Sequence, residues 1–494
     1  MKIFIAVALL VGVGGLNAQT ATAPAPAAPR APVLGVVDTA RVDSMVRADM
    51  ARRNLVGLSV GVLHEGRVVY LRGYGTADRA GNAMVDTLTR FAIGSITKQF
   101  TGAVILQLAA EGRLSLDDPV SKWYPELTRA ADIRLRDVMN MVSGYTDYYP
   151  LDFLDRRMLR PIAPDSVIRW YGKAPLDFEP GSRYSYSNTG YILLGRVAER
   201  VTGRPFARLL RERIFQPLGL RNTRYEPDRR ERGDAQGYAA FALADQQPAV
   251  PEGRGWIAAA GAIWTTPSDL LRWDAALMEG RVVGGEWLRE MTTERRLTNG
   301  AGTGYGFGLA IGRAMGDTTW AHSGGVSGFI SQNIMVPRTR SALVVLSNFE
   351  GTIAMGPLFR ATIPLRPAPP PDTTRRAGAA AQPAPPPAAP VPVIAGPPAQ
   401  DMATTLLRQL QAGRVDRSLL GEEFDFWLTD ARIASTASRL AALGEPTRVE
   451  PGSPVERGGM EVTSTRFVFG GRSLSALMYR TPDGKVQEFL VSAQ

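Results

Sequence analysis

Cysteine is absent from this chain of 494 residues, and histidine occurs only twice, as His64 and His322. The absence of cysteine excludes disulfide bonds, thiolate metal ligands, a catalytic thiol and lipidation of an N-terminal cysteine. Two histidines are too few for a histidine-rich zinc site, so a metal would have to bind to carboxylates. We therefore predict neither a metal nor a cofactor.

Lysine is also scarce, because only five of the 57 basic residues are lysines. The formal net charge is nevertheless +10, and such a basic balance can indicate binding to nucleic acid. The arginines are spread along the chain and alternate with acidic residues, as in residues 228–232. This distribution is typical of a solvated surface, and we predict no nucleic-acid partner.

Long apolar runs are missing as well. The longest one, residues 3–16, has about 14 residues, whereas a membrane-spanning helix needs about 20. It follows Met1-Lys2 and ends at Leu16-Asn17-Ala18, the pattern of a secretory signal peptide that is cleaved after residue 18. We expect an exported protein, periplasmic or secreted, that does not span a membrane.

Proline and alanine mark the expected domain boundaries. Residues 19–35 form an Ala/Pro-rich tether, and residues 367–398 contain 12 prolines, which predicts an extended linker over 366–400. The expected organisation is a signal peptide (1–18), the tether, a main domain (36–365), the linker and a small α+β domain (401–494). The last domain lacks histidine and any evident catalytic pair, so we interpret it as an accessory domain whose partner the sequence does not indicate.

Local patterns predict strands at both ends of the main domain and helices in its middle. Residues 58–63 and 67–71 flank a glycine-containing turn and predict a hairpin, and a helical pattern runs from Ser95 to Gly112. Further strands are expected at 305–311, 328–336 and 342–348. In the tail we expect helices at 402–410 and 431–443 and strands at 462–468, 474–479 and 486–491.

The first chemically informative segment is Gly94-Ser95-Ile96-Thr97-Lys98. A serine at a helix start, with a lysine three positions later, places both side chains on one face. Serine is a weak nucleophile that needs a base, and a desolvated lysine can serve as one. The backbone N–H groups of the helix N-terminus would stabilise an oxyanion. A capping serine followed by a surface lysine would show the same pattern.

Two later segments could complete such a site. Tyr186-Ser187-Asn188 offers a phenol that can exchange a proton and an amide that can hold the lysine and the substrate. Residues 321–325, Ala-His-Ser-Gly-Gly, combine an imidazole, a hydroxyl and glycines at an expected strand start. Each motif alone is weak, but all three in one chain are unlikely to arise by chance.

In this combination the sequence resembles the serine β-lactamase and penicillin-binding-protein superfamily. The resemblance is to the branch of class C β-lactamases, D-alanyl-D-alanine carboxypeptidases, D-aminopeptidases and family VIII carboxylesterases, and it extends over most of residues 36–362. It implies an α/β (α+β) fold of the β-lactamase/transpeptidase type. That fold has an antiparallel sheet flanked by helices and an all-helical insertion, here followed by the small α+β domain.

The resemblance also implies roles for individual residues. Ser95 would be the acylated nucleophile, Lys98 its activating partner and Tyr186 the proton shuttle. Asn188 would orient the lysine and the substrate. The remaining implied substrate-binding residues are His322, Ser323, Gly324 and Gly325, with the N–H groups of Ser95 and Gly325 forming the oxyanion hole.

Two departures from the family pattern bear on the substrate. His322 stands where class C β-lactamases usually carry lysine, and a neutral imidazole attracts a carboxylate less than an ammonium does. Met141-Val142-Ser143-Gly144-Tyr145 replaces a frequent His-Thr-Ser-Gly-Leu. Separately, Gly57-Leu58-Ser59-Val60-Gly61 matches the α/β-hydrolase nucleophile elbow, but it lies within an expected strand, and we interpret it as a chance match.

The leading hypothesis is therefore an exported serine hydrolase that forms a covalent acyl-enzyme on β-lactams or D-Ala-type peptides. A family VIII-type carboxylesterase with the same catalytic residues remains open, because both chemistries need the same groups. A binding or sensing protein without turnover is the third possibility. The expected ligand is a small molecule or peptide: a β-lactam, a D-amino-acid peptide or an ester.

Overall fold

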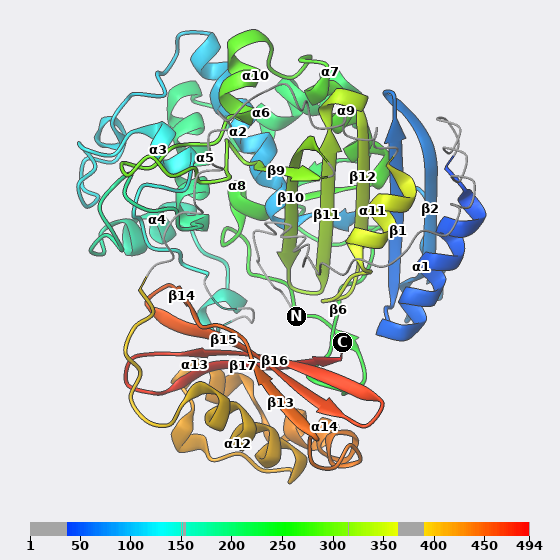
Figure 1. The fold of residues 1–494 in the computed structure, drawn as a ribbon. Coiled ribbons are helices and arrows are strands. Elements are labelled where there is room, and N and C mark those ends of the chain that lie inside the picture. The colour runs from blue at the N-terminus through cyan, green and yellow to red at the C-terminus, as the bar shows by residue number, and fades with distance from the viewer. Residues whose placement is uncertain (1–36, 150, 152–154, 315, 364–389, 494) are drawn as a thin grey trace, which may run out of the picture.

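A seven-stranded antiparallel sheet lies at the centre of the main domain (Figure 1). The computed structural model describes residues 37–149, 151, 155–314, 316–363 and 390–493. The expected signal peptide, the tether and most of the linker lie outside these residues. In spatial order the strands are β3 (Ala83–Met84), β2 (Arg67–Asp78), β1 (Gly57–His64), β12 (Ser341–Ser347), β11 (Phe329–Val336), β10 (Asp317–Val326) and β9 (Ala310–Ala314).

The sheet joins the two ends of the main domain. Strand β1 pairs with β12, so that Leu58 lies opposite Ser347 and Leu63 opposite Ala342. Both strands are buried on both faces, which explains their nearly continuous apolar sequences. The small residue Gly61 lets helix α9 (Pro267–Met278) approach, because a Cβ there would lie 2.9 Å from Leu271 Cδ1.

Helices cover the two faces of this sheet and build a separate helical region beside it (Figure 1). On one face α1 (Thr39–Arg53) and α11 (Met355–Thr362) pack against the valines and leucines of β1 and β12. The opposite face carries the largest core, which is continuous with the helical region. The other helices there are α2 (Thr97–Ala110), α3 (Leu135–Met139), α4 (Pro164–Gly172), α5 (Asn188–Thr202), α6 (Phe206–Leu210), α7 (Gln216–Leu218), α8 (Ala258–Gly261) and α10 (Gly285–Thr292).

Two small sheets accompany the main sheet. In one, β8 (Ile263–Thr265) lies between β4 (Phe91–Ala92) and β5 (Arg224–Tyr225), and in the other β6 (Tyr238–Ala239) pairs with β7 (Gln247–Pro248). None of the helices within the described part of the chain is long and apolar enough to cross a membrane.

The expected fold is confirmed, with two local corrections. The strand predicted over 305–311 is wrong for most of its length, because β9 covers Ala310–Ala314. Residues 321–325 were expected before a strand, but they lie near the end of β10, which the pattern did not predict. The two glycines and the polar residues of this segment hide its strand character, since glycine and small polar residues are poor indicators of a strand.

The tail forms a second sheet with its own core. Its strands run in the order β13 (Arg448–Pro451), β15 (Met460–Phe469), β16 (Arg472–Arg480) and β17 (Val486–Ala493), and β14 (Val455–Arg457) also pairs with β15. Helices α12 (Ala399–Gln411), α13 (Glu422–Trp427) and α14 (Asp430–Ala441) cover one face of this sheet. The tail therefore contains the α+β elements that its sequence pattern predicts.

The tail packs against the main domain at more than one place. Phe241, in the segment between β6 and β7, belongs to the tail's hydrophobic core and meets Trp427 edge-on, with 5.4 Å between ring centroids. Arg439 of α14 pairs with Asp245 at 2.7 Å, and Arg156 pairs with the acidic start of α13. In Figure 1 the strands β14 and β15 lie on the side of the tail that faces the helical region.

Candidate active site

Ser95 and Lys98 lie where a short 3₁₀ turn leads into a buried helix. The turn covers Gly94–Ile96, and α2 follows directly. Gly94 has a φ of +50°, a left-handed conformation that glycine adopts without strain. Nearly every residue of α2 is buried, so the lysine that the 3-residue spacing places beside the serine has no access to solvent: Lys98 is 0% exposed.

The ammonium of Lys98 is held by three oxygen acceptors from three parts of the chain. Its Nζ donates to Ser95 Oγ at 3.0 Å, to Asn188 Oδ1 at 2.7 Å and to the carbonyl oxygen of Ala260 at 2.8 Å. Asn188 begins α5 and Ala260 lies in α8. The carbonyl of Ala260 is a partner that sequence reasoning missed, since a backbone acceptor leaves no signal in residue type.

Burial controls the charge of this lysine. It lowers the pKa of Lys98 from 10.5 to about 7, and the carboxylate of Asp147 opposes the shift only in part. Near neutral pH the amine is therefore present in both forms. The neutral form, 3.0 Å from Ser95 Oγ, can accept the serine proton.

Asp147 is a second site residue that the sequence did not reveal. Its Oδ1 accepts hydrogen bonds from the backbone N–H of Asn188 at 3.0 Å and from the Asn188 Nδ2 at 3.1 Å. These bonds fix the amide so that its oxygen faces Lys98. The carboxyl is buried, and burial raises its pKa above the usual value. The sequence contained one indication of Asp147: it lies just after Met141–Tyr145, the segment that departs from the family pattern.

Tyr186 lies beside both the serine and the lysine. The Lys98 Nζ lies 4.9 Å from the centroid of the Tyr186 ring. Burial raises the pKa of the phenol well above 10, and a hydrogen bond with Ser95 offsets only part of this shift. The phenol is therefore protonated at neutral pH and can donate a proton rather than accept one.

His322 is a neutral side chain in this site. Burial, together with the charge of Lys98, lowers the pKa of His322 to about 3. Its Nδ1 lies against the Ser323 carbonyl oxygen and must donate to it, so the Nε2 accepts the hydrogen bond of the Tyr305 hydroxyl at 2.9 Å. The His322 side chain is thus no cation, in contrast to the lysine that class C β-lactamases usually carry at this position. The imidazole faces Tyr186, with 6.1 Å between ring centroids.

The glycines of β10 allow this strand to lie directly against the serine turn. A Cβ at Gly324 would overlap the carbonyl oxygen of Ile93, and one at Gly94 would lie 2.8 Å from the backbone nitrogen of Gly325. The structure thus brings the Gly325 N–H to the residue preceding Ser95. Ser323 is on the same strand but, within the described chain, lies outside the hydrogen bonds that connect Ser95, Lys98 and Asn188.

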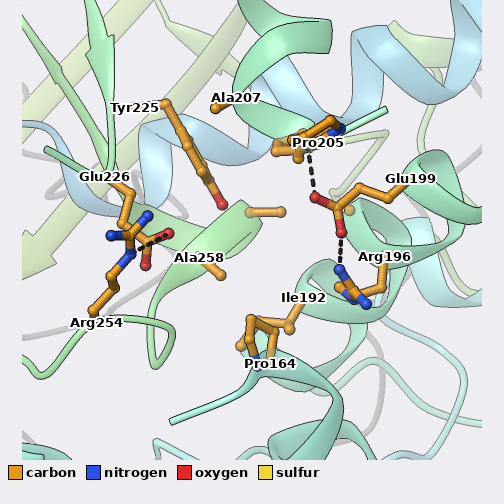
Figure 2. A pocket seen from close by; sticks show the side chains of 13 residues that line it. Pro164, Ile192, Arg196, Glu199, Pro205, Ala207, Tyr225, Glu226, Arg254 and Ala258 are labelled. Atoms are coloured by element: carbon orange, nitrogen blue, oxygen red, sulfur yellow. Dashed lines mark hydrogen bonds and ion pairs between the residues drawn. The ribbon is translucent and has the colours of Figure 1, made fainter. Parts of the chain in front are cut away.

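A pocket of about 160 Å³, separate from the predicted site residues, lies next to α8 (Figure 2). Ala258 and Ala259, directly before Ala260, contribute to its wall, but none of the predicted site residues does. Its acidic residues have nearby partners, since Glu199 bonds to Arg196 and to the Phe206 N–H. Likewise Ser59 is no nucleophile elbow, because it lies inside β1 and donates to the Arg72 carbonyl oxygen at 3.1 Å.

Comparison with known proteins places this geometry in a family. The family model described as Beta-lactamase matches residues 42–360, which include every site residue named above. The chain belongs to the Beta-lactamase family. The predicted superfamily of serine hydrolases is thereby confirmed.

The names of two similar proteins refer to D-stereochemistry. A D-aminopeptidase of Brucella anthropi is 30% identical over 320 residues, which are 64% of this chain and 60% of that enzyme. The structure of a D-stereospecific amidohydrolase from a Streptomyces species is 28% identical, with a TM-score of 0.58, and the match covers 66% of this chain and 98% of that one.

One solved structure is similar over both parts of the chain. The octameric penicillin-binding protein homologue of Pyrococcus abyssi matches 92% of this chain and 99% of its own length, with a TM-score of 0.58 and 21% identity. At this identity the likeness concerns the fold alone. It shows that the β-lactamase-type domain and a tail of this kind occur together in another chain.

Proposed function

We propose that this chain is a serine amidohydrolase that forms an acyl-enzyme at Ser95 and acts on amides or short peptides of D-amino acids. The observation that carries the proposal is the buried amine of Lys98, with a pKa of about 7, at 3.0 Å from the serine hydroxyl. Such an arrangement supplies a base for the nucleophile near neutral pH.

Acylation follows from the positions of the groups. Neutral Lys98 takes the Ser95 Oγ proton as Oγ attacks the substrate carbonyl carbon. The N–H groups of Ser95 and Gly325 stabilise the resulting oxyanion. When the C–N bond breaks, the leaving nitrogen receives a proton from the phenol of Tyr186, and the phenol regains one from the Lys98 ammonium.

Deacylation repeats these steps with water as the nucleophile. The water loses a proton to the Lys98 amine, attacks the acyl carbon and releases the acid, while Ser95 Oγ recovers its proton. Asn188 keeps the amine aimed at the serine throughout, because its amide oxygen accepts from Nζ at 2.7 Å.

The neutral imidazole of His322 supports an amide substrate. A D-Ala-D-Ala peptide or a β-lactam presents a carboxylate, and a cation at this position would attract it. With a pKa of about 3, His322 gives no such attraction near neutral pH. The D-aminopeptidase and amidohydrolase names of the relatives point in the same direction.

Export and the domain division form part of the proposal. The N-terminal pattern of residues 1–18 supports secretion or a periplasmic location, in which D-amino-acid peptides of cell walls would be accessible. The Pro/Ala-rich stretch supports a linker between the main domain (36–365) and the accessory domain (401–494).

A comparison of five substrates tests the reaction. We expect hydrolysis of D-alanine p-nitroanilide to exceed that of its L-isomer, of nitrocefin and of a D-Ala-D-Ala peptide. Hydrolysis of p-nitrophenyl butyrate alone would instead identify a carboxylesterase. Turnover of none of them, in a protein that still binds penicillin, would favour a sensing protein.

Covalent labelling tests the nucleophile. A fluorophosphonate should add its mass to the peptide that contains Ser95, and the Ser95→Ala variant should remain unlabelled by mass spectrometry. Ser435→Ala is the matched control, because this serine is exposed on α14 of the tail. Labelling of Ser95→Ala at an unchanged rate would contradict the proposed nucleophile.

A further inference from the structure

Helix α8 carries one of the three oxygen acceptors of the Lys98 amine, and it is too short to hold its own position. It comprises four residues, Ala258–Gly261, and the first of them has a φ of +29°. Residues other than glycine rarely adopt this left-handed conformation, which persists only where surrounding contacts hold it. The place of the Ala260 carbonyl oxygen therefore depends on contacts from outside the helix.

Two buried threonines of α2 supply such contacts on either side of Ala260. The hydroxyl of Thr101 donates to the carbonyl oxygen of Ala259 at 2.7 Å. The hydroxyl oxygen of Thr97 accepts from the backbone N–H of Ile263 at 3.1 Å. Both threonines are 0% exposed. The helix that carries the lysine thus holds the chain just before and just after the carbonyl to which the lysine donates.

The Ala260 carbonyl determines where the lone pair of the neutral Lys98 amine points. A neutral lysine nitrogen has two N–H groups and one lone pair. The oxygens of Asn188 and Ala260, at 2.7 and 2.8 Å from Nζ, accept these two N–H groups. The lone pair then faces the hydroxyl of Ser95, 3.0 Å away, as a base requires. Without the Ala260 carbonyl an N–H group can turn toward the serine instead, and in that orientation the amine is not a base.

The surroundings of α8 leave it room to move away from α2. Ala258 and Ala259 form part of the wall of the pocket of about 160 Å³ that Figure 2 shows. On the side of α2, the Thr101 hydroxyl ties Ala259 directly to the helix of Lys98. Loss of this hydroxyl therefore releases α8 on one side, while the pocket gives it space to shift.

We propose that Thr101 is a positioning residue of the active site: its hydroxyl fixes α8 so that the carbonyl oxygen of Ala260 stays within hydrogen-bond distance of the Lys98 amine. Thr101 acts through the backbone of α8, because its hydroxyl contacts the carbonyl oxygens of Ala259 and, at 3.4 Å, of Thr97. The inference rests on the proposed function, since the amine that it positions is the proposed base for Ser95.

The sign of the expected pH effect follows from the hydrogen bond to Ala260. A carbonyl that accepts from an ammonium stabilises the charged form. If this carbonyl withdraws, the pKa of Lys98 falls below its value of about 7, and the acid limb of the rate profile moves to lower pH. The other titratable groups around the amine keep their places: Asp147 and Tyr186 before α5, Tyr191 on α5 and His322 on β10.

The experiment measures the rate of fluorophosphonate labelling of Ser95 against pH in the full-length protein. We expect Thr101→Val to label about 10- to 100-fold more slowly at the plateau, the size of a small misplacement of a catalytic group, with its acid limb at lower pH. Thr101→Ser keeps the hydroxyl and should restore most of the rate.

A second buried threonine provides the matched control. Thr362 on α11 is 1% exposed and donates to the Leu358 carbonyl oxygen at 2.8 Å, on the sheet face away from the helical region. Thr362→Val removes the same kind of hydrogen bond and should leave the labelling rate and the pH profile unchanged.

Urea unfolding provides a readout that does not depend on activity. Because its folded-state pKa is lower, Thr101→Val should lose more unfolding free energy than Thr362→Val between about pH 10 and about pH 6. An unchanged rate and profile in Thr101→Val, or a slower rate with an unmoved acid limb, would overturn the inference. If circular dichroism shows that Thr101→Val does not fold, Thr101→Ala replaces it. Absence of labelling in the unmodified protein would overturn the proposed function, and the unfolding comparison would still decide the role of Thr101.

Discussion

Lys98 is an amine that folding removes from water, and this has a consequence for stability. Its pKa falls from 10.5 to about 7, so the folded protein binds this proton less readily than the unfolded chain does. The free energy of unfolding is therefore highest above about pH 10.5. It decreases as the pH falls toward 7, because the unfolded chain takes up the proton at a higher pH than the folded protein does. The residue that we propose as the base thus makes the fold less stable near neutral pH.

The Lys98→Met variant tests this linkage. We expect the unmodified protein to lose stability relative to the variant between pH 10 and pH 7, by on the order of 4 kcal/mol at most. Urea unfolding of both proteins at the two pH values measures the difference. Lys173→Met, which removes an exposed lysine, should show a constant difference. A pH-independent difference for Lys98→Met would contradict a lowered pKa.

Tyr186 is the proton donor of the proposed mechanism, and its hydroxyl can be removed with little change in shape. Tyr186→Phe should lower turnover by about two to four orders of magnitude, the usual contribution of a general acid or base. Steady-state hydrolysis of D-alanine p-nitroanilide provides the measurement. Tyr184→Phe is the control. Tyr184 precedes Tyr186 by two residues, but its ring packs against Tyr305, so this variant should alter the rate little.

At the scale of elements, the contact between β10 and the serine turn depends on one missing side chain. A methyl group at Gly324 would overlap the Ile93 carbonyl oxygen, and the chain from Ile93 leads directly to Ser95. Gly324→Ala should therefore displace the N–H groups of Ser95 and Gly325, which we propose as oxyanion donors. We expect labelling of Ser95 to slow by about 10²-fold or more, with about 1–3 kcal/mol lost in unfolding free energy.

A glycine on the neighbouring strand supplies the comparison for this variant. At Gly312 on β9 an added Cβ would meet only the Thr319 hydroxyl at 3.1 Å, a side chain that can rotate away. Gly312→Ala should leave both labelling and unfolding nearly unchanged. Equal labelling rates and equal unfolding free energies of the two variants would show that the close approach at Gly324 does not affect function.

Elements with a strong apolar period were predictable, and those that carry the site were less so. Strands β11 and β12 and helix α5 follow their patterns, because burial selects apolar residues at regular positions. Strand β10 was missed, since its Ser-Gly-Gly segment is selected for close approach to the serine turn. Its sequence therefore reflects a neighbour from a distant part of the chain.

At the scale of the whole molecule, Phe241 makes a hydrophobic contact between the main domain and the tail that a substitution can remove. Phe241 comes from the main domain, is 7% exposed and lies in the core of the tail. Phe241→Ala should weaken the docking of the tail by about 3 kcal/mol. We expect calorimetry to show two separate unfolding transitions where the unmodified protein shows one.

A substitution of an exposed residue completes this test. Leu88 is 61% exposed, so Leu88→Ala should preserve a single transition at nearly the same temperature. One unshifted transition for Phe241→Ala would show that this contact does not couple the two parts. The sequence predicts an accessory domain behind a linker, and in the structure Phe241, Leu151 and Arg183 of the main domain contact this tail.

The sequence alone determined which reactive groups this protein has, and in what local order. The serine-lysine spacing, the tyrosine-asparagine pair and the glycines of residues 321–325 are contained in short segments, and short-range geometry is readable from spacing. The sequence alone also excludes cysteine chemistry, and it shows the regular apolar patterns of the main strands and helices.

Only the tertiary structure decided how those groups behave. The lowered pKa of Lys98 and the neutral state of His322 arise from burial, which depends on the whole fold and leaves no mark in the motif itself. The carbonyl of Ala260 meets the Lys98 amine from a position 162 residues away in the chain. Desolvation and long-range charge act through space, and sequence distance carries no information about either.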